Sequence, residues 1–226
     1  MHIIYLKHEK AFLLESSCHK VEGLTTRNKR SVQCTLLLFV FLGGIMRLYS
    51  ISDKYINYLR SCYPRIYSNK EDLSVHTRKY LGAVIELSDY KYYIPLSSPK
   101  QKHDYVIVDG ERKIRKNSLI VIRITEKKGN IEELKGTLQI GTMIPVPESE
   151  LVEYDVNSEN DIDYRNLVWS ELEYIRKHEK KIIRNAKILY SKKLNGCQDK
   201  IVKYCLDFKG VEEVCDKWKA CNHDDR

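Results

Sequence analysis

The chain is predicted to be an α+β domain in which a small, strongly curved antiparallel sheet is flanked by a short N-terminal helix and a long C-terminal helix. Two β-rich runs at residues 80–87 and 90–95 are separated by a two-residue turn, which is the pattern of a β-hairpin. A later stretch repeats apolar residues at steps of three and four, which is the period of an amphipathic helix. A small antiparallel sheet of this kind is expected to be barrel-like.

Residues 1–45 differ from the rest of the chain because they show no clear period and no convincing helix caps. Their apolar run, residues 35–42, is shorter than the roughly 20 residues that cross a bilayer, and it starts too late for a signal peptide. The codons of residues 43–46 can form a purine-rich ribosome-binding site followed by a start codon. We therefore expect a domain over residues 46–226 that starts biologically at Met46, after a mis-annotated or disordered extension.

The first elements of this domain are a strand and a short helix. Residues 47–51 alternate polar and apolar side chains, which predicts a strand. Ser52 is expected to cap the helix that follows, whose apolar residues recur at helical spacing as far as Cys62. Residues 63–77 are polar and contain a proline, which predicts a loop.

The central part of the chain predicts the remaining strands. Pro95 is expected to end the second strand of the hairpin, because proline lacks the N–H that pairing needs. Residues 119–124 are strongly apolar and predict a strand, which a turn at residues 127–130 follows. Two short strand pieces are expected around residues 138–146, with a break at Gly141.

The last long element is a helix that is expected from about residue 164, with Asp163 as its N-cap. Its apolar stripe consists of Val168, Leu172, Ile175, Ile182, Ala186 and Leu189. Its opposite face carries Arg176, Lys177, Lys180, Lys181 and Lys187. That face is either simply solvated or a surface that follows phosphates, and both alternatives stay open. The tail from about residue 195 is expected to be weakly determined.

The charge of the chain favours a polyanionic partner. Lysine and arginine number 39 against 31 acidic residues, which leaves a net charge of +8. Such a surplus suits nucleic acid or an acidic membrane surface, although a soluble protein can also be basic without such a partner. The 16 tyrosines suit stacking on unpaired bases and are equally ordinary in a β-sheet.

The cysteines indicate a reducing compartment rather than a zinc site. There are seven, an odd number, and none form a Cys-x-x-Cys pair. Free thiols in the cytoplasm are therefore expected, while a disulfide among the last four cysteines stays open.

The segment that follows the hairpin, residues 95–103, is the strongest candidate site. It brings together Ser97, Ser98, Lys100 and His103, which can bind a phosphate, transfer protons and neutralise negative charge without a metal. Each also has a structural explanation, as part of a Ser-Pro turn or as a solvated surface residue. No compact acidic cluster lies near the segment, which disfavours a two-metal nuclease.

From residue 46 onward the chain resembles the ToxN/AbiQ family, the endoribonuclease toxins of type III toxin–antitoxin and phage-abortive systems. Residues 46–59 resemble the family's opening strand and helix, and residues 78–82 its basic-aromatic-glycine strand. The run Pro95-Leu96-Ser97-Ser98-Pro99-Lys100 resembles its Pro-Leu-Thr/Ser-Ser-Pro-Lys active-site segment. Residues 143–146 and 167–175 resemble its late strand and its long helix.

The resemblance implies a twisted sheet related to that of the MazF/Kid toxins, and RNA cleavage without metal or cofactor. It also implies inhibition by a small, structured, repeat-derived antitoxin RNA, in closed assemblies that the RNA bridges. By residue match, Ser97, Ser98 and Lys100 fall on the active-site segment and Arg78 on a basic position that is often lysine. A family tyrosine upstream of that position has no clear match here, and His76 or Tyr67 are the candidates to replace it.

Metal-free RNA scission uses the ribose 2′-OH as nucleophile and needs a base, an acid and cations for the crowded phosphorane. Lys100 and Arg78 are expected to supply charge, Ser97 and Ser98 hydrogen bonds to the phosphate, and His103 a proton shuttle. The residues expected to bind RNA outside this centre are Lys79, Lys102, Arg176, Lys180 and Lys181.

Two other functions compete with a ribonuclease that acts on cellular or phage RNA. One is a non-catalytic RNA-binding protein that uses the same basic surface. The other is a peripheral membrane protein that uses residues 35–42. Cleavage of RNA in EDTA separates the first alternative from the enzyme.

Overall fold

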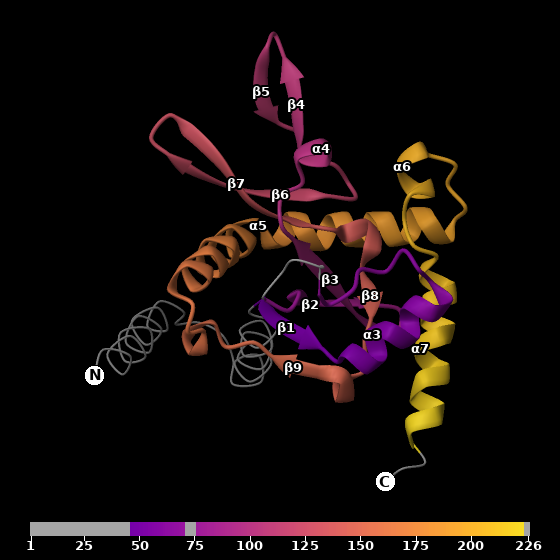
Figure 1. Cartoon of the computed structure of the whole chain (residues 1–226). Helices are drawn as coiled ribbons and strands as arrows, with labels where there is room; N and C mark the ends of the chain where they lie inside the picture. Colours follow the sequence, from indigo (N-terminus) through magenta and orange to yellow (C-terminus); the bar gives the residue numbers. More distant parts are fainter. Residues whose placement is uncertain (1–45, 71–75, 224–226) are drawn as a thin grey trace, which may run out of the picture. The chain divides into compact units, whose positions relative to one another are not determined.

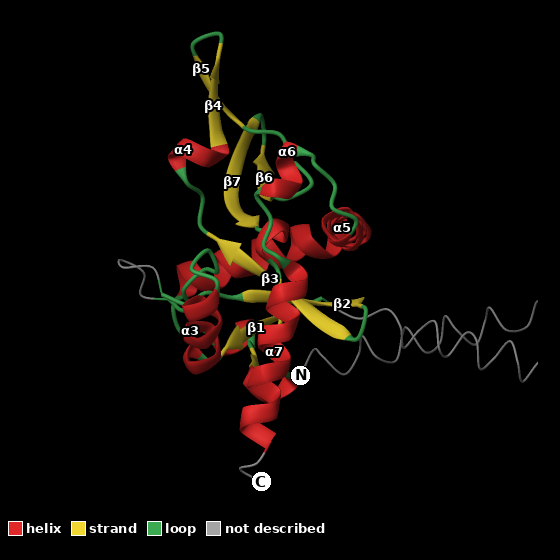
Figure 2. Ribbon diagram, turned by 90° about the vertical axis from the view of Figure 1, so that its right-hand side faces the viewer, coloured by secondary structure: helices red, strands yellow, loops and turns green. Residues whose placement is uncertain are grey.

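The computed structural model describes residues 46–70 and 76–223, which form a mixed α+β fold (Figures 1 and 2). Its main sheet is antiparallel and runs in the spatial order β6-β7-β3-β2-β1-β9, with β8 paired to β3. The strands are β1 (Arg47–Ile51), β2 (Tyr80–Leu87), β3 (Tyr90–Ser97), β6 (Ile122–Lys128), β7 (Ile131–Leu138), β8 (Ile144–Pro145) and β9 (Leu151–Glu153). The order ends at β6 and β9, so the sheet is open among the described residues and no closed barrel is observed.

β3 is the central strand, and its C-terminal end carries the candidate site. It pairs with β2 along one edge and with β7 and β8 along the other. The strand continues to Ser97, so the expectation that Pro95 ends it is wrong. At this position the pairing uses the carbonyl of Pro95, which accepts a hydrogen bond from the Gln139 amide at 3.0 Å. The missing N–H of Pro95 therefore does not interrupt the sheet.

The β6–β7 hairpin was only partly predicted. β6 begins at Ile122, later than expected, and the turn after Lys128 lies where it was predicted. β7 replaces the short strand piece that was expected near residue 138. Lys135 is an extra residue in its pairing with β6, which makes a β-bulge next to Gly136.

A second hairpin, β4 (Tyr105–Val108) and β5 (Glu111–Ile114), was missed. It projects from the sheet beside the short helix α4 (Gln101–Asp104) in both views (Figures 1 and 2). Its turn is Asp109-Gly110, whose φ angles are 53° and 78°. Asp-Gly is a strong signal for such a turn, so the sequence did contain the evidence for this hairpin.

The two predicted helices are present as α3 (Asp53–Cys62) and α5 (Ile162–Leu194). Ser52 caps α3 as expected, because its Oγ accepts a hydrogen bond from the Tyr55 amide at 3.2 Å. The N-cap of α5 is Asp161 rather than Asp163, because the Asp161 carboxylate accepts from the amides of residues 163 and 164 at 3.0 Å. The expected stripe of α5 is confirmed by the burial of Val168, Leu172, Ile175, Ile182, Ala186 and Leu189.

The tail that was expected to be weakly determined contains α6 (Lys200–Lys203) and a long helix, α7 (Phe208–His223). The buried apolar side chains of α7 are Phe208, Val211, Val214, Cys215 and Trp218. Its buried Glu212 accepts hydrogen bonds from the hydroxyls of Tyr92 and Tyr190 at 2.8 and 2.6 Å, and it pairs with Lys209 at 2.9 Å. These contacts connect α7 to β3 and to α5.

Five cysteines lie within the described residues, and all five are free thiols, so no disulfide joins the last four. In residues 46–70 and 76–223, no helix combines the length and the apolar character that crossing a bilayer requires. The expectations for residues 1–45, including the apolar run and the start at Met46, concern a part of the chain outside the described residues.

Candidate functional site

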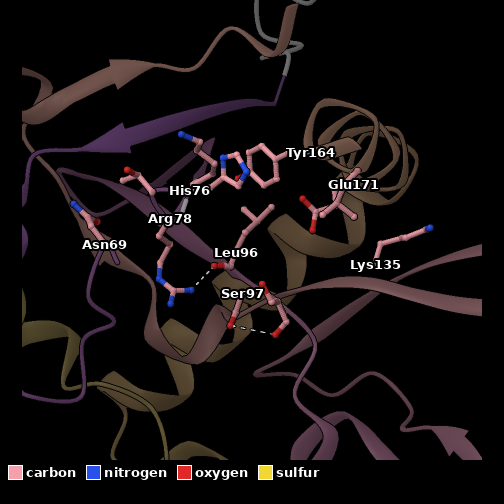
Figure 3. Close-up of a pocket in the computed structure, with 12 residues that line it drawn as sticks. Asn69, His76, Arg78, Leu96, Ser97, Lys135, Tyr164 and Glu171 are labelled. Atoms are coloured by element: carbon pink, nitrogen blue, oxygen red, sulfur yellow. Dashed lines mark hydrogen bonds between the residues drawn. The ribbon is translucent and has the colours of Figure 1, made fainter. Parts of the chain in front are cut away.

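A pocket of about 220 Å³ lies at the C-terminal end of β3 (Figure 3). Four parts of the chain form it: the residues before β2, the end of β3, the bulge of β7 and the first turns of α5. The residues that line it are Asn69, His76, Thr77, Arg78, Lys79, Leu96, Ser97, Ser98, Lys135, Tyr164, Leu167 and Glu171. The fold thus brings the predicted serines together with Arg78 and Lys79, which are far from them in the sequence.

The two serines have different environments. Ser97 is buried, its carbonyl accepts from the Thr137 hydroxyl at 3.2 Å, and its own hydroxyl donates to the Ser98 carbonyl at 3.4 Å. Ser98 is exposed at the pocket. The hydroxyl of Ser98 is therefore the better placed of the two to meet a phosphate, while Ser97 joins β3 to β7.

Arg78 connects the loop before β2 to β3. Its Nε donates to the Ser68 carbonyl at 2.9 Å and its Nη1 to the Leu96 carbonyl at 2.6 Å, and its guanidinium lies 4.6 Å from the centre of the Tyr67 ring. The residue is buried, with only 8% of its surface exposed. Arg78 therefore has a structural role in this loop, in addition to the positive charge that it brings to the pocket.

Lys100 lies on the other side of Arg78. It is exposed, it lines a second pocket of about 390 Å³ that Arg78 also lines, and its Nζ lies 5.7 Å from the Tyr67 ring centre. Among the residues that the structure describes, the cations around this second pocket are Arg60, Arg65, Lys70, Arg78 and Lys100, and no acidic residue lines it. The structure thus places a basic pocket directly beside the serine pocket.

Arg60, Arg65 and Lys70 of this second pocket were not predicted from the sequence. They lie on α3 and in the loop after it, where no pattern relates them to residue 100. Only the fold of the loop around Arg78 brings them together.

The turn that carries Lys100 is held by a buried ion pair. The Asp104 carboxylate accepts from the Lys100 amide at 2.8 Å and pairs with the Arg123 guanidinium at 3.1 Å. The side chains of Asp104 and Arg123 are 5% and 9% exposed. No role was predicted for Asp104, because its partner Arg123 is on β6, 19 positions later in the chain.

Lys79 is a further cation of the serine pocket. Its Nζ lies 4.0 Å from the centre of the Tyr154 ring and 3.4 Å from the Ser50 hydroxyl. Burial lowers the pKa of Lys79. A partly desolvated lysine in a pocket is a suitable ligand for a phosphate, as expected of an RNA-binding residue.

The other predicted residues lie outside both pockets. Lys102 and His103 are exposed on α4, and Arg176, Lys180 and Lys181 are exposed on α5. Arg176 contacts the half-exposed Trp169, with 5.9 Å between the guanidinium and the ring centre. The roles that were expected of these five residues stay predictions.

His76 and Tyr164 form an aromatic wall of the serine pocket. Their rings are stacked, with centres 3.7 Å apart and planes 3° apart, and His76 Nε2 lies 3.2 Å from the Asp161 carboxylate. Burial raises the pKa of Tyr164 to about 12, and the neighbouring Glu171 adds to the rise. His76 was one of two candidates to replace the family tyrosine, and the structure places it in the pocket.

Within the described residues, no group of three or more His, Cys, Asp or Glu side chains is arranged to hold a metal ion. The described functional groups of the two pockets are hydroxyls, cations, aromatic rings and the buried carboxyl group of Glu171.

The sequence that forms this fold matches one protein family. Residues 47–216 match the family described as Toxin ToxN, type III toxin-antitoxin system. The chain belongs to this family.

Bacterial relatives of the chain are named for their activity. The endoribonuclease AbiQ of Lactococcus lactis subsp. lactis is 29% identical over 167 residues, which cover 74% of this chain and 86% of that protein. The endoribonuclease ToxN of Pectobacterium atrosepticum is 28% identical over 151 residues, which cover 67% of this chain and 83% of that protein.

Solved structures agree with the fold. AbiQ, described as a lactococcal anti-phage endoribonuclease of a type III system, superposes with a TM-score of 0.64 at 26% identity, over 78% of this chain and 99% of that one. A second structure, described in terms of selective toxin inhibition by a non-coding RNA pseudoknot, has a TM-score of 0.63 at 26% identity, over 77% and 98%. These comparisons confirm the family resemblance and the mixed α+β fold with its long helix.

Proposed function

We propose that this chain is the toxin of a type III toxin–antitoxin system and that it cleaves RNA without a bound metal ion. The observation that carries the proposal is the position of Ser98 and Lys100 directly after β3, where two pockets share Arg78. Membership of the ToxN family and the named activity of its relatives support it.

The proposed reaction is attack of a ribose 2′-OH on the adjacent phosphorus, with loss of the 5′-oxygen. The exposed Ser98 hydroxyl and the backbone around it would hydrogen-bond the non-bridging oxygens. Lys100 and Lys79 would approach the phosphate from its two sides, because each lines a different one of the two adjacent pockets. Their positive charges would stabilise the phosphorane, which carries more negative charge than the ground state.

The RNA would extend beyond the reacting phosphate over the second pocket, where Arg60, Arg65 and Lys70 supply further cations. The antitoxin would be a small structured RNA that occupies the same surface without being cleaved, and the targets would be cellular or phage RNA. A relative described as inhibited by an RNA pseudoknot supports this partner. We also propose that toxin and antitoxin RNA form an RNA-bridged assembly.

Three further statements belong to the proposal. The open sheet would be related to that of the MazF/Kid toxins, and the protein would act in the cytoplasm. The functional domain would begin at Met46, which agrees with the start of the family match at residue 47.

The test is cleavage of labelled RNA by the purified chain in EDTA, with Lys100→Ala as the active-site variant. Lys113→Ala is the matched control, because Lys113 is exposed on β5 and lines neither pocket. We expect wild type and Lys113→Ala to cleave and Lys100→Ala to bind RNA without cleaving it. RNA binding without cleavage by wild type would instead identify a non-catalytic RNA-binding protein.

A further inference from the structure

Glu171 is a buried carboxyl group in the serine pocket that the proposed chemistry has not used. It lies on α5, is only 8% exposed, and its carboxyl group points from the helix towards the end of β3 (Figure 3). Among the described residues, no hydrogen bond or ion pair engages this carboxyl group. A carboxyl group buried without such a partner is costly, and groups of this kind concentrate at functional sites.

The neighbouring lysine does not neutralise Glu171. Lys135 lines the same pocket, but its ammonium pairs with Glu133 at 2.7 Å and with Glu126 at 3.2 Å. Figure 3 shows the Lys135 side chain directed away from the Glu171 carboxyl.

The bulge of β7 makes the space for this carboxyl. A Cβ at Gly136 would lie 2.0 Å from Oε1 of Glu171 and 3.6 Å from the carbonyl oxygen of Ser97. Those two oxygens are therefore no more than about 5.6 Å apart. The absence of a side chain at Gly136 thus leaves room for the Glu171 carboxyl group near the end of β3.

We propose that Glu171 is the general acid of the RNA cleavage proposed above, and that it delivers the proton to the departing 5′-oxygen. The inference rests on the proposed function. In this step the bond from the 2′-oxygen to phosphorus forms while the bond from phosphorus to the 5′-oxygen breaks. The 5′-oxygen takes the proton of the Glu171 carboxyl, the 2′-OH proton leaves to solvent, and the carboxylate then regains a proton from water.

The protonation state of Glu171 agrees with this role. Burial raises the pKa of Glu171 to about 8, so the group holds its proton at neutral pH. A phosphate bound nearby would favour the protonated form further. Within residues 46–70 and 76–223, the other titratable or charged groups that face the pocket are His76, Arg78 and Lys79 before β2, Lys135 on β7 and Tyr164 on α5.

The experiment measures single-turnover cleavage in EDTA across pH, with a labelled transcript that the wild-type chain cleaves. Glu171→Gln keeps the shape of the side chain but removes the acidic proton of the carboxyl group. We expect cleavage to fall about 10²- to 10⁴-fold. We expect the wild-type rate to decline above pH 8, where Glu171 loses its proton, and we expect this decline to be absent in the variant. Binding of the same transcript with a 2′-deoxy nucleotide at the cleavage site should be unchanged.

Two further variants separate chemistry from structure. Glu173→Gln is the matched control, because Glu173 is exposed on the same helix and should keep the wild-type rate and pH profile. Gly136→Ala keeps the Glu171 carboxyl group but moves it, because the new Cβ would clash with Oε1. Cleavage by this variant should therefore fall, while thermal unfolding shows a folded protein.

Cleavage by Glu171→Gln at the wild-type rate, with the alkaline decline still present, would overturn this inference while leaving the proposed function intact. A wild-type chain that does not cleave RNA would overturn both.

Discussion

The ion pair between Asp104 and Arg123 should contribute far more to stability than the ion pairs on the surface. Its nitrogen and oxygen are 3.1 Å apart, and its side chains are 5% and 9% exposed. The second Asp104 oxygen holds the Lys100 amide, and Arg123 also donates to the carbonyls of His103 and Lys116 at 3.0 and 2.8 Å. Asp104→Asn keeps the shape of the side chain and leaves the Arg123 charge buried without its counter-charge.

The expected loss follows from burial. Removing one partner of a buried ion pair typically costs about 3–5 kcal/mol. The Nε of Arg123 already lacks a hydrogen-bond partner among the described residues. The rest of the pocket around the guanidinium therefore offers little to replace the lost counter-charge. The exposed pair of Arg47 and Glu153 is the matched control, with side chains 51% and 52% exposed at 2.7 Å. Breaking such a surface pair by Glu153→Gln costs about 0–1 kcal/mol.

Equilibrium unfolding in urea at neutral pH measures both variants. We expect Asp104→Asn to lower the free energy of unfolding by about 3–5 kcal/mol with an unchanged m-value, and Glu153→Gln by less than about 1 kcal/mol. RNA cleavage by Asp104→Asn should also decrease, because the turn that carries Lys100 is loosened. Equal losses in the two variants would show that the burial argument is wrong.

Three further predictions concern pH, chain length and salt. Burial raises the pKa of Glu171 from 4.5 to about 8, so the folded protein loses stability as the pH rises through that range. The variant Glu171→Gln has no such group to ionise, and its free energy of unfolding at pH 7 should therefore exceed that of wild type by up to roughly 3 kcal/mol. A chain that starts at Met46 should cleave RNA and melt like the full chain, and a large drop in melting temperature would contradict the proposed start. Replacing Arg176, Lys180 and Lys181 by glutamine should weaken RNA affinity and reduce its dependence on salt, and an unchanged salt slope would exclude them from the interface.

Local patterns predicted the elements that form the core. Ser52 as a cap, the hairpin turn at Ser88 and the apolar stripe of α5 depend on neighbours within a few positions, so the sequence contained the whole signal. α7 carries a similar stripe from Phe208 to Trp218, and the same criterion would have identified it.

Elements that depend on distant pairing could not be predicted in the same way. The strand continues past Pro95 because Gln139, far along the chain, donates to its carbonyl. The bulge at Lys135 is a property of the pairing between β6 and β7 and has no local signature. The extent of β3 and β7 therefore became visible only in the sheet.

The residues of the candidate site also differ in whether a local sequence pattern could identify them. Ser98 and Lys100 were identified because they share one segment that resembles a family motif. Glu171 was passed over because an isolated glutamate on a helix is usually solvated, and its burial depends on Gly136 of another element. Arg60 was missed for the same reason, since only the folded loop brings it to the pocket of Lys100.

The central claim is that the chain cleaves RNA by attack of a ribose 2′-OH without a metal ion. The most direct measurement is cleavage in EDTA of one transcript in two forms, all-ribose and with a single 2′-deoxy nucleotide on the 5′ side of the mapped cleavage site. We predict that the all-ribose transcript is cleaved to a 2′,3′-cyclic phosphate and a 5′-OH, and that the 2′-deoxy transcript is bound but stays intact. Cleavage of the 2′-deoxy transcript at the same site, or activity only when a divalent metal is added back, would contradict the claim.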